Sequence, residues 1–232
     1  MSYMPAGDID RAREALAASG AALELRQDAE GLTLVGESLT VRGDFRRLLP
    51  RLRPASLARE LLVRAARVRG VEHPCCVDAT AGLGEDALLL AAAGFTVTLI
   101  ERDPVIAALL ADTLRRAREV PQLVEAVDRM RALEGDSVAY LHEEQTTPDV
   151  VYLDPMFPAR GKSAAVKKKF QLIHQLERPC EDEESLVRAA LAARPRKVVI
   201  KRPIKGPQLA GIKPSHVVSG KAVRYDCVVL PR

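Results

Sequence analysis

The pattern of apolar and polar residues divides the chain into a short first part and a longer second part. From residue 75 onward, short apolar runs rich in β-branched residues alternate with longer segments whose apolar residues recur at helical spacing. This alternation is typical of a doubly wound, mostly parallel α/β sheet of the Rossmann-like type. It predicts an α/β domain over residues 55–232 and a small α+β extension over residues 1–54.

The elements expected in the second part follow in chain order. The strands are residues 75–79, 96–100, 129–133, 150–153 and 197–200, and the helices are residues 56–69, 86–93, 104–118, 163–175 and 183–193. A turn at Lys201-Arg202-Pro203 should end the fifth strand. Two β-rich runs, residues 216–219 and 223–230, flank Gly220 and predict an antiparallel C-terminal hairpin at the sheet edge.

The first part predicts one helix and a small sheet. Residues 8–19 have the spacing of an amphipathic helix. Three short apolar segments, 23–25, 32–35 and 39–41, are separated by polar and glycine residues, which indicates an antiparallel meander. The arginine-rich stretch up to Pro54 is expected to be a linker.

Composition narrows the class of protein. A hydrophobic fraction of 47% and a charged fraction of 28% are those of an ordinary globular protein. No apolar run approaches the roughly 20 residues of a membrane span, and the N-terminus lacks a signal-peptide pattern, so we expect a cytoplasmic protein. The four cysteines show no C-x-x-C spacing and the four histidines are scattered, so we expect reduced thiols and no metal site.

Charge favours an anionic partner. The net charge is only +4, but the basic residues are clustered. One cluster comprises Arg160, Lys162, Lys167, Lys168 and Lys169, and a second comprises Arg42, Arg46, Arg47, Arg51 and Arg53. Nucleic acid is the commonest partner of such clusters, although a solvated lysine face on a helix is the alternative for the first. Lys201 and Arg202 are weaker candidates for the same RNA-binding surface.

The turn after the first strand is a candidate cofactor site. It begins at Asp78 and contains Gly82 and Gly84, whose lack of a side chain lets a ligand approach the backbone. Glu85 and Asp86 then occupy the start of the helix, where two carboxylates would repel a pyrophosphate. S-adenosylmethionine carries a sulfonium and an ammonium group and suits acidic neighbours. Alternatively, the two acids only complement the helix dipole.

Two further acids end strands. Glu101 lies 23 positions after Asp78, close to the separation at which an acid reaches ribose hydroxyls. Asp136 follows the third strand and could accept the adenine amine, or it could cap the helix that begins at Ser137.

The fourth strand runs into Asp154-Pro155-Met156-Phe157. A carboxylate at the carboxyl end of a central strand lies where open α/β sheets bind ligands. Asp154 and a backbone carbonyl could accept both hydrogens of an exocyclic amine, and Phe157 could stack on the base. A capping aspartate beside a core phenylalanine is the simpler alternative. We take Asp154, Pro155 and Phe157 as candidate catalytic residues.

The order and spacing of these motifs resemble class I S-adenosylmethionine-dependent methyltransferases. Asp154-Pro155-Met156-Phe157 looks like the Asp/Asn-Pro-Pro-aromatic motif of the amino-methylating members, with Met156 in place of the second proline. Residues 77–84, 101–110, 151–158, 162–168, 199–203 and 221–226 are similar to the ribosomal RNA small subunit methyltransferase J family, and the resemblance covers roughly residues 75–230.

The resemblance implies methylation of the N2 amine of a guanine near the 3′ end of 16S rRNA, with 16S rRNA or the small ribosomal subunit as partner. It also implies cofactor contacts at Glu85, Asp86, Glu101, Arg102, Asp136, Ser137 and Asp154. A methyltransferase acting on another RNA or on a small amine, and a non-catalytic RNA-binding protein on this fold, stay open as alternatives.

Overall fold

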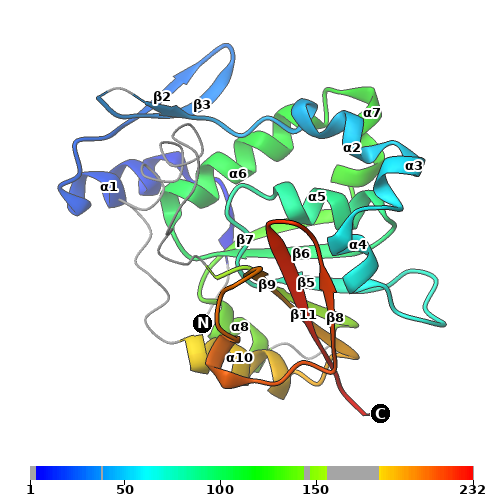
Figure 1. Ribbon diagram of the computed structural model, residues 1–232. Helices are drawn as coiled ribbons and strands as arrows, with labels where there is room; N and C mark the ends of the chain where they lie inside the picture. The colour runs from blue at the N-terminus through cyan, green and yellow to red at the C-terminus, as the bar shows by residue number, and fades with distance from the viewer. Residues whose placement is uncertain (1–3, 38, 144–146, 156–182, 232) are drawn as a thin grey trace.

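The computed structural model describes residues 4–37, 39–143, 147–155 and 183–231. An eight-stranded sheet forms its centre, in the order β1-β7-β6-β5-β8-β9-β11-β10 (Figure 1). The strands are β1 (Met4–Pro5), β5 (Cys75–Asp78), β6 (Thr96–Glu101), β7 (Met130–Glu134), β8 (Val150–Leu153), β9 (Lys197–Pro203), β10 (His216–Ser219) and β11 (Val223–Val229). The expected strands and the C-terminal hairpin are therefore confirmed.

The pairing of the strands is also as expected for a doubly wound sheet. The five strands from β7 to β9 are parallel, while β11, β10 and the short β1 are antiparallel to their neighbours. Chain order reverses between β5 and β8, because β6 and β7 lie on one side of β5 and β8 and β9 on the other. Ligands bind at such a switch point, outside the carboxyl ends of the strands.

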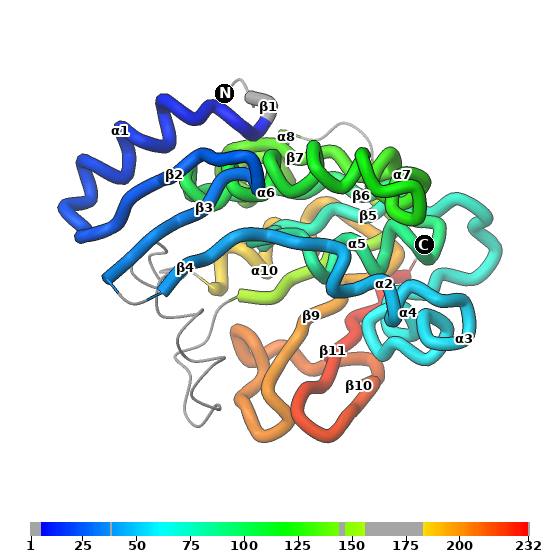
Figure 2. The backbone as a smooth tube through the Cα atoms, turned by 90° about the horizontal axis from the view of Figure 1, so that it is seen from above, coloured from blue at the N-terminus to red at the C-terminus, as the bar shows by residue number. Residues whose placement is uncertain are grey.

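Helices cover both faces of the sheet (Figures 1 and 2). One face carries α4 (Leu61–Ala66), α5 (Glu85–Ala92), α6 (Pro104–Ala117) and α7 (Pro121–Val127), whose apolar residues share a core with one side of the strands. The other face carries α8 (Ser137–Glu143) and α10 (Glu183–Ala192) over a second core. The central strands β5, β6 and β8 are largely buried from both sides, which explains why they appear in the sequence as mostly apolar runs.

The N-terminal residues form the predicted helix and meander. The elements are α1 (Ile9–Ser19), β2 (Glu24–Asp28), β3 (Gly31–Val35) and β4 (Thr40–Val41). Asp8 caps α1 by accepting a hydrogen bond from the backbone of Arg11 at 3.0 Å. A third core joins these elements to α6, through residues such as Leu32, Leu34 and Ile106. The meander therefore packs on α6 (Figure 2).

Three local expectations were wrong. The arginine-rich stretch is no linker: it forms η1 (Phe45–Leu48) and α2 (Leu49–Leu52), because Phe45 and Leu48 are buried in the main core. The helix expected over 56–69 is two short helices, α3 (Pro54–Leu57) and α4, separated where Glu60 adopts an extended conformation.

Residues 201–203 are the third correction, since they continue β9 instead of turning. They pair with residues 223–225 of β11, and the turn comes only after Pro203. Sequence reasoning also missed α7, β1 and the short η2 (Leu209–Gly211). The helix expected over 163–175 lies outside the described residues.

Candidate active site

The carboxyl ends of β5, β6, β8 and β9 bring most of the predicted cofactor residues, and the predicted catalytic residues Asp154 and Pro155, to one edge of the sheet. The turn after β5 lies beside the ends of β6 and β8, because β5 is hydrogen-bonded to both strands. Asp154 and Pro155 follow β8 directly. The carboxyl edge therefore collects residues that are far apart in the sequence.

The glycine turn leaves its backbone open at one point. Both Gly82 (φ +53°) and Gly84 (φ +76°) have left-handed backbone conformations that favour glycine. A Cβ atom added at Gly84 would lie 2.7 Å from a methyl group of Leu110, so this glycine allows close packing against α6. A Cβ atom at Gly82 would meet nothing within 4 Å. Space for a ligand therefore lies against the backbone of Gly82.

Glu101 holds this turn in place. Its carboxylate accepts hydrogen bonds from the backbone of Gly82 at 2.8 Å and of Asp103 at 2.9 Å. Burial raises the pKa of Glu101 to about 7, although the two backbone donors oppose the shift. Each carboxylate oxygen has a further lone pair, so the same side chain can also accept hydrogen bonds from ligand hydroxyls.

A lysine lies between two carboxylates at the centre of the site. The Nζ atom of Lys201 on β9 is 2.6 Å from Oδ2 of Asp86 and 2.8 Å from Oδ2 of Asp154. The hydroxyl of Tyr152 on β8 donates to the same oxygen of Asp86 at 2.6 Å. Strands β8 and β9 and the first turn of α5 thus contribute to one charged cluster, which we call the Lys201 cluster: Lys201, Asp86, Asp154 and Tyr152.

The charges of the Lys201 cluster stabilise one another. Burial alone would raise the pKa of Asp86, but the charge of Lys201 and the hydrogen bonds from Lys201 and Tyr152 outweigh it and lower the pKa. Burial alone would lower the pKa of Lys201, but the two carboxylates raise it. Lys201 is therefore a cation and Asp86 an anion at neutral pH.

Asp78 lies behind the site. It is 1% exposed, and its carboxylate accepts a hydrogen bond from the backbone of Thr80 at 3.1 Å. The hydroxyl of Thr80 in turn accepts a hydrogen bond from the backbone of Asp154 at 2.6 Å. The burial of Asp78 differs from the expected cofactor contact, and we assign its side chain to shaping the turn.

The pH dependence of stability should reveal the burial of Asp78. Burial raises its pKa to about 8, so the folded protein keeps its proton where the unfolded chain, with an ordinary pKa near 4, has lost it. The free energy of unfolding should therefore fall as pH rises from about 4 to 8. Asp78→Asn cannot ionise at this position. Its free energy of unfolding, measured by urea unfolding at pH 5, 7 and 9, should therefore fall by a few kcal/mol less than that of the wild type. Equal slopes for both proteins would contradict this assignment.

The remaining predicted cofactor residues surround the same edge. Asp136 accepts a hydrogen bond from the backbone of Ala139 at 2.9 Å, which is the capping role considered as its alternative. The hydroxyl of Ser137 donates to the carbonyl of Ala79 at 2.6 Å and ties α8 to the β5 turn. Glu85 and Arg102 are exposed at the starts of α5 and α6.

The structure describes only two of the predicted RNA-binding residues, Lys201 and Arg202. Phe157 and the basic residues Arg160, Lys162, Lys167, Lys168 and Lys169 lie outside the described residues. Lys201 belongs to the Lys201 cluster, and Arg202 is 1% exposed and donates to the carbonyl of Pro207 at 2.8 Å. Neither side chain is on an open surface, so the expected phosphate contacts of these two residues do not fit the structure.

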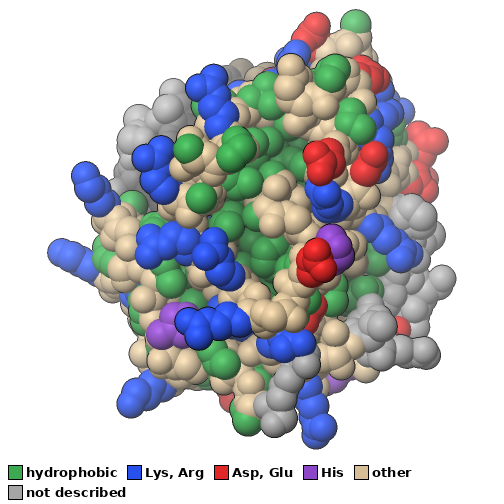
Figure 3. Space-filling model, turned by 90° about the vertical axis from the view of Figure 1, so that its right-hand side faces the viewer, with side chains coloured by type: hydrophobic (Ala, Val, Ile, Leu, Met, Phe, Trp, Pro, Cys, Tyr) green, Lys and Arg blue, Asp and Glu red, His purple; other side chains and the backbone are tan. Residues whose placement is uncertain are grey.

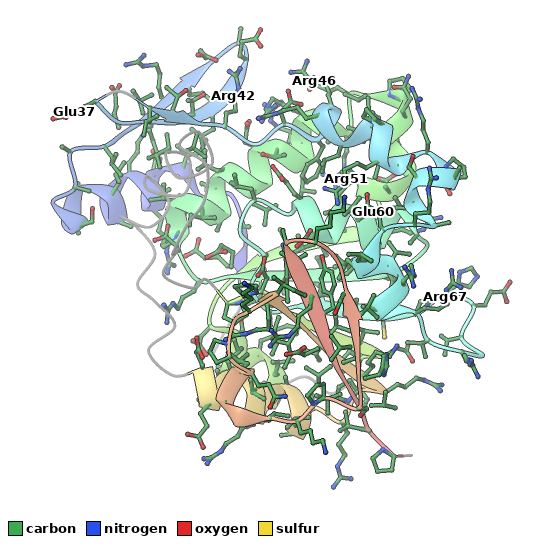
Figure 4. All side chains as sticks on the ribbon, in the orientation of Figure 1. Glu37, Arg42, Arg46, Arg51, Glu60 and Arg67 are labelled. Carbon is green, nitrogen blue, oxygen red and sulfur yellow. The ribbon has the colours of Figure 1, made fainter. Side chains whose placement is uncertain are left out.

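The arginines of the second basic cluster mostly have acidic partners. Arg46 binds Asp44 at 2.9 Å and Arg51 binds Glu60 at 2.8 Å. Figure 4 shows Arg51 and Glu60 facing each other above the sheet. The clustering of these arginines in the sequence therefore overstates the free positive charge at this surface.

Sequence reasoning missed the polar contacts that build the Lys201 cluster. Tyr152 was interpreted only as a strand residue, and Lys201 was placed in a turn. One signal was available in the sequence. If β9 continues through residue 201, its pairing with β8 places Lys201 at the carboxyl edge, beside Asp154, which directly follows β8.

The fold and the site define a class I S-adenosylmethionine-dependent methyltransferase. A family model of SAM-dependent methyltransferases matches residues 10–230. A crystal structure of the SAM-dependent methyltransferase NGO1261 from Neisseria gonorrhoeae superposes with a TM-score of 0.69 at 34% identity, covering 85% of this chain and 78% of that chain. Ribosomal RNA small subunit methyltransferase J of Thioalkalivibrio sulfidiphilus is 41% identical over 96% of this chain and 94% of its own length. The chain belongs to the ribosomal RNA small subunit methyltransferase J family.

A second relative supports the same assignment. Ribosomal RNA small subunit methyltransferase J of Neisseria meningitidis is 40% identical, over 91% of this chain and 85% of its own length. Within the described residues no helix is long and apolar enough to cross a membrane, and no group of metal-binding side chains occurs.

The residues at the carboxyl edge fit S-adenosylmethionine. The open backbone at Gly82 and the carboxylate of Glu101 beside it suit a nucleoside with free ribose hydroxyls. The carboxylates of Asp86 and Asp154 suit the positive charges of the methionine part.

Proposed function

We propose that this S-adenosylmethionine-dependent enzyme methylates the exocyclic N2 amine of a guanine near the 3′ end of 16S rRNA. The observation that carries the proposal is the position of Asp154, which is an acid at the carboxyl end of β8, 36% exposed at its side chain and tethered by Lys201. Family membership supports rRNA as the substrate. The bacterial cytoplasm is where the enzyme would meet the small subunit.

Asp154 would bind the target amine. A guanine amine is a poor nucleophile, because its lone pair is delocalised into the ring. A carboxylate that accepts one N–H, together with the adjacent backbone carbonyl of Asp154 or Pro155, would orient the nitrogen. Correct placement of the reacting atoms can supply roughly 7–11 kcal/mol. Phe157 would stack on the base, which must leave its own stack to enter the site.

When bound, S-adenosylmethionine would supply the electrophilic methyl group, and its sulfur would be the leaving group, keeping the electron pair of the broken S–C bond as a neutral thioether. As the new N–C bond forms, the amine nitrogen gains positive charge, and the carboxylate of Asp154 stabilises that charge. The nitrogen then loses a proton, which Asp154 can accept and pass to solvent because its side chain is partly exposed. Lys201 would keep its positive charge and stay bound to both carboxylates throughout.

Glu101 and Gly82 would bind the nucleoside part of the methyl donor. Glu101 already holds the turn through two backbone hydrogen bonds, so the site is largely formed before the donor binds. Glu85, Asp86, Arg102, Asp136 and Ser137 are proposed as further donor-binding residues around it.

Transfer of a labelled methyl group tests the proposal. Purified protein with labelled donor should methylate 16S rRNA or small subunits from cells that lack the enzyme, and the product should be N2-methylguanosine. Label found only in low-mass amines or in another RNA would support the corresponding alternative. Donor binding without any transfer would leave an RNA-binding protein on this fold.

A further inference from the structure

Several exposed arginines on one side of the molecule have no acidic partner among the described residues. Residues 53–72 contain five arginines and two glutamates. All five arginines are exposed, and none of their side chains makes an ion pair within residues 4–37, 39–143, 147–155 and 183–231. Arg59, Arg64 and Arg67 are the three that lie on α4 or within two residues of it. We call these three residues the arginine track. Glu60, the acid nearest to Arg59 and Arg64 in the sequence, is already bound by Arg51 at 2.8 Å.

Many exposed arginines elsewhere on the described surface have an acidic partner. Exposed arginines that are bound to acids include Arg13, Arg26, Arg46, Arg115, Arg118 and Arg188. Within the arginine track, Arg64 lies in the last turn of α4 and Arg67 follows the helix directly, so two cations without an acidic partner lie near one end of the helix. An anionic partner would stabilise these cations by supplying the negative charge that the described residues do not place beside them.

The arginine track runs from the active-site edge of the sheet to the opposite edge. Leu61, at the start of α4, lies against Gly220 in the β10–β11 turn, which is at the carboxyl edge. At the other end of α4, the carbonyls of Ala65 and Arg67 accept hydrogen bonds from Lys197 at 2.8 and 2.7 Å. Lys197 begins β9, so this end lies at the amino edge of the sheet.

The beginning of the track is close to the active site. Arg51, which holds Glu60, lies near enough to Asp86 that each charge shifts the pKa of the other group. The two ends of β9 are roughly 20 Å apart at about 3.3 Å per residue. A ligand that contacts the whole track and the active site must therefore be a polyanion of at least this length.

Figure 3 looks onto this side of the molecule. Lys and Arg side chains are spread over the face, whereas Asp and Glu side chains gather toward the right of the view. Figure 4 shows the side chain of Arg67 pointing outward from the body of the protein. The cations are thus accessible to a large partner.

We propose that the arginine track binds the phosphate backbone of the RNA that carries the target guanine, along α4 and away from the active site. This inference rests on the proposed rRNA substrate. Arginine suits the role because its guanidinium group can donate two parallel hydrogen bonds to one phosphate. Contacts so far from the reacting atoms are the same in the ground state and in the transition state, so they should lower KM without changing kcat.

The test neutralises the track. The triple variant Arg59→Gln/Arg64→Gln/Arg67→Gln is compared with a control of equal charge change, Arg13→Gln/Arg26→Gln/Arg188→Gln. Binding of a naked 3′ fragment of 16S rRNA is measured against salt concentration. The plot of log affinity against log salt should become shallower by about 2 to 3 for the track variant, at 0.7–0.9 per phosphate contact. Its KM should rise at least tenfold with kcat unchanged, while the control should stay near wild type.

Three results would overturn the inference: an unchanged salt slope, an equal loss in the control, or weaker binding to assembled subunits but not to naked RNA. The last result would indicate an acidic protein as partner. Thermal unfolding and donor binding by calorimetry confirm that both variants are folded. Failure of the proposed function would be seen in the wild-type protein, which would then methylate no RNA, so the two failures are distinguishable.

Discussion

Replacing Asp154 with alanine should lower methyl transfer by at least about 10²–10³-fold, the usual effect of removing one group that stabilises transition-state charge. The loss should fall mainly on kcat, because the carboxylate acts on charge that develops at the amine during transfer. The variant should still fold. The hydrogen bond to the hydroxyl of Thr80 comes from the backbone N–H of residue 154, which alanine keeps, and Lys201 still has Asp86 as a partner. Single-turnover transfer to 16S rRNA measures the effect.

Two further variants sharpen this result. Asp154→Asn keeps an acceptor oxygen but cannot take the proton, so the activity that it retains separates orientation of the amine from proton transfer. Asp128→Ala removes an exposed acid, with a side chain 59% exposed, and should transfer at the wild-type rate. Near-normal turnover of Asp154→Ala would refute the role of Asp154.

Replacing Lys201 with methionine should be the second large effect. The change removes the cation that Asp86 and Asp154 share. Because these side chains are only partly buried, the loss of stability should be smaller than the roughly 3–5 kcal/mol for breaking a fully buried pair. Because Lys201 lowers the pKa of Asp86, the variant should have a higher pKa at Asp86. The acid limb of its pH–rate profile should therefore move to higher pH, and transfer at neutral pH should fall at least tenfold.

Lys197→Met is the matched control for Lys201. Lys197 lies on the same strand and is partly buried, but its ammonium binds two backbone carbonyls and no carboxylate. Lys197→Met should unfold at a lower temperature, but the acid limb of its pH–rate profile should not shift. Lys201→Arg keeps the positive charge and should retain more activity than Lys201→Met. If the pH–rate profile of Lys201→Met is not shifted, Lys201 does not control the ionisation of Asp86 during the reaction and has only a structural role.

The sequence predicted those parts of the fold that depend on repeated local patterns. Strands buried on both faces are continuous apolar runs, and α6 has both a capping aspartate, Asp103, and a proline at its start. The arginine-rich stretch failed as a prediction, because two apolar residues, Phe45 and Leu48, outweigh the many cations around them once they reach the core. Burial of that kind depends on the three-dimensional surroundings, which a local pattern does not contain.

The site shows the same division. Glu101 and Asp154 were predicted because each acid ends an apolar strand, and strand ends meet at one edge. The partners of these acids were not, because the contact between Lys201 and Asp86 joins residues 115 positions apart. Asp78 looked the same as Glu101 in the sequence, yet it is buried behind the turn and 1% exposed. Glu101 is also buried, but its carboxylate binds the backbone of Gly82, whereas that of Asp78 binds the backbone of Thr80. These long-range and local partners separate the two acids, and the sequence does not show them.

Mapping of methylated guanines in 16S rRNA tests the central claim most directly. Cells with and without the gene should differ at a single N2-methylguanosine near the 3′ end, and the gene carrying Asp154→Ala should fail to restore it although the protein accumulates normally. An identical methylation map in all three strains, or restoration by the Asp154→Ala protein, would contradict the assignment of this edge of the sheet to guanine methylation.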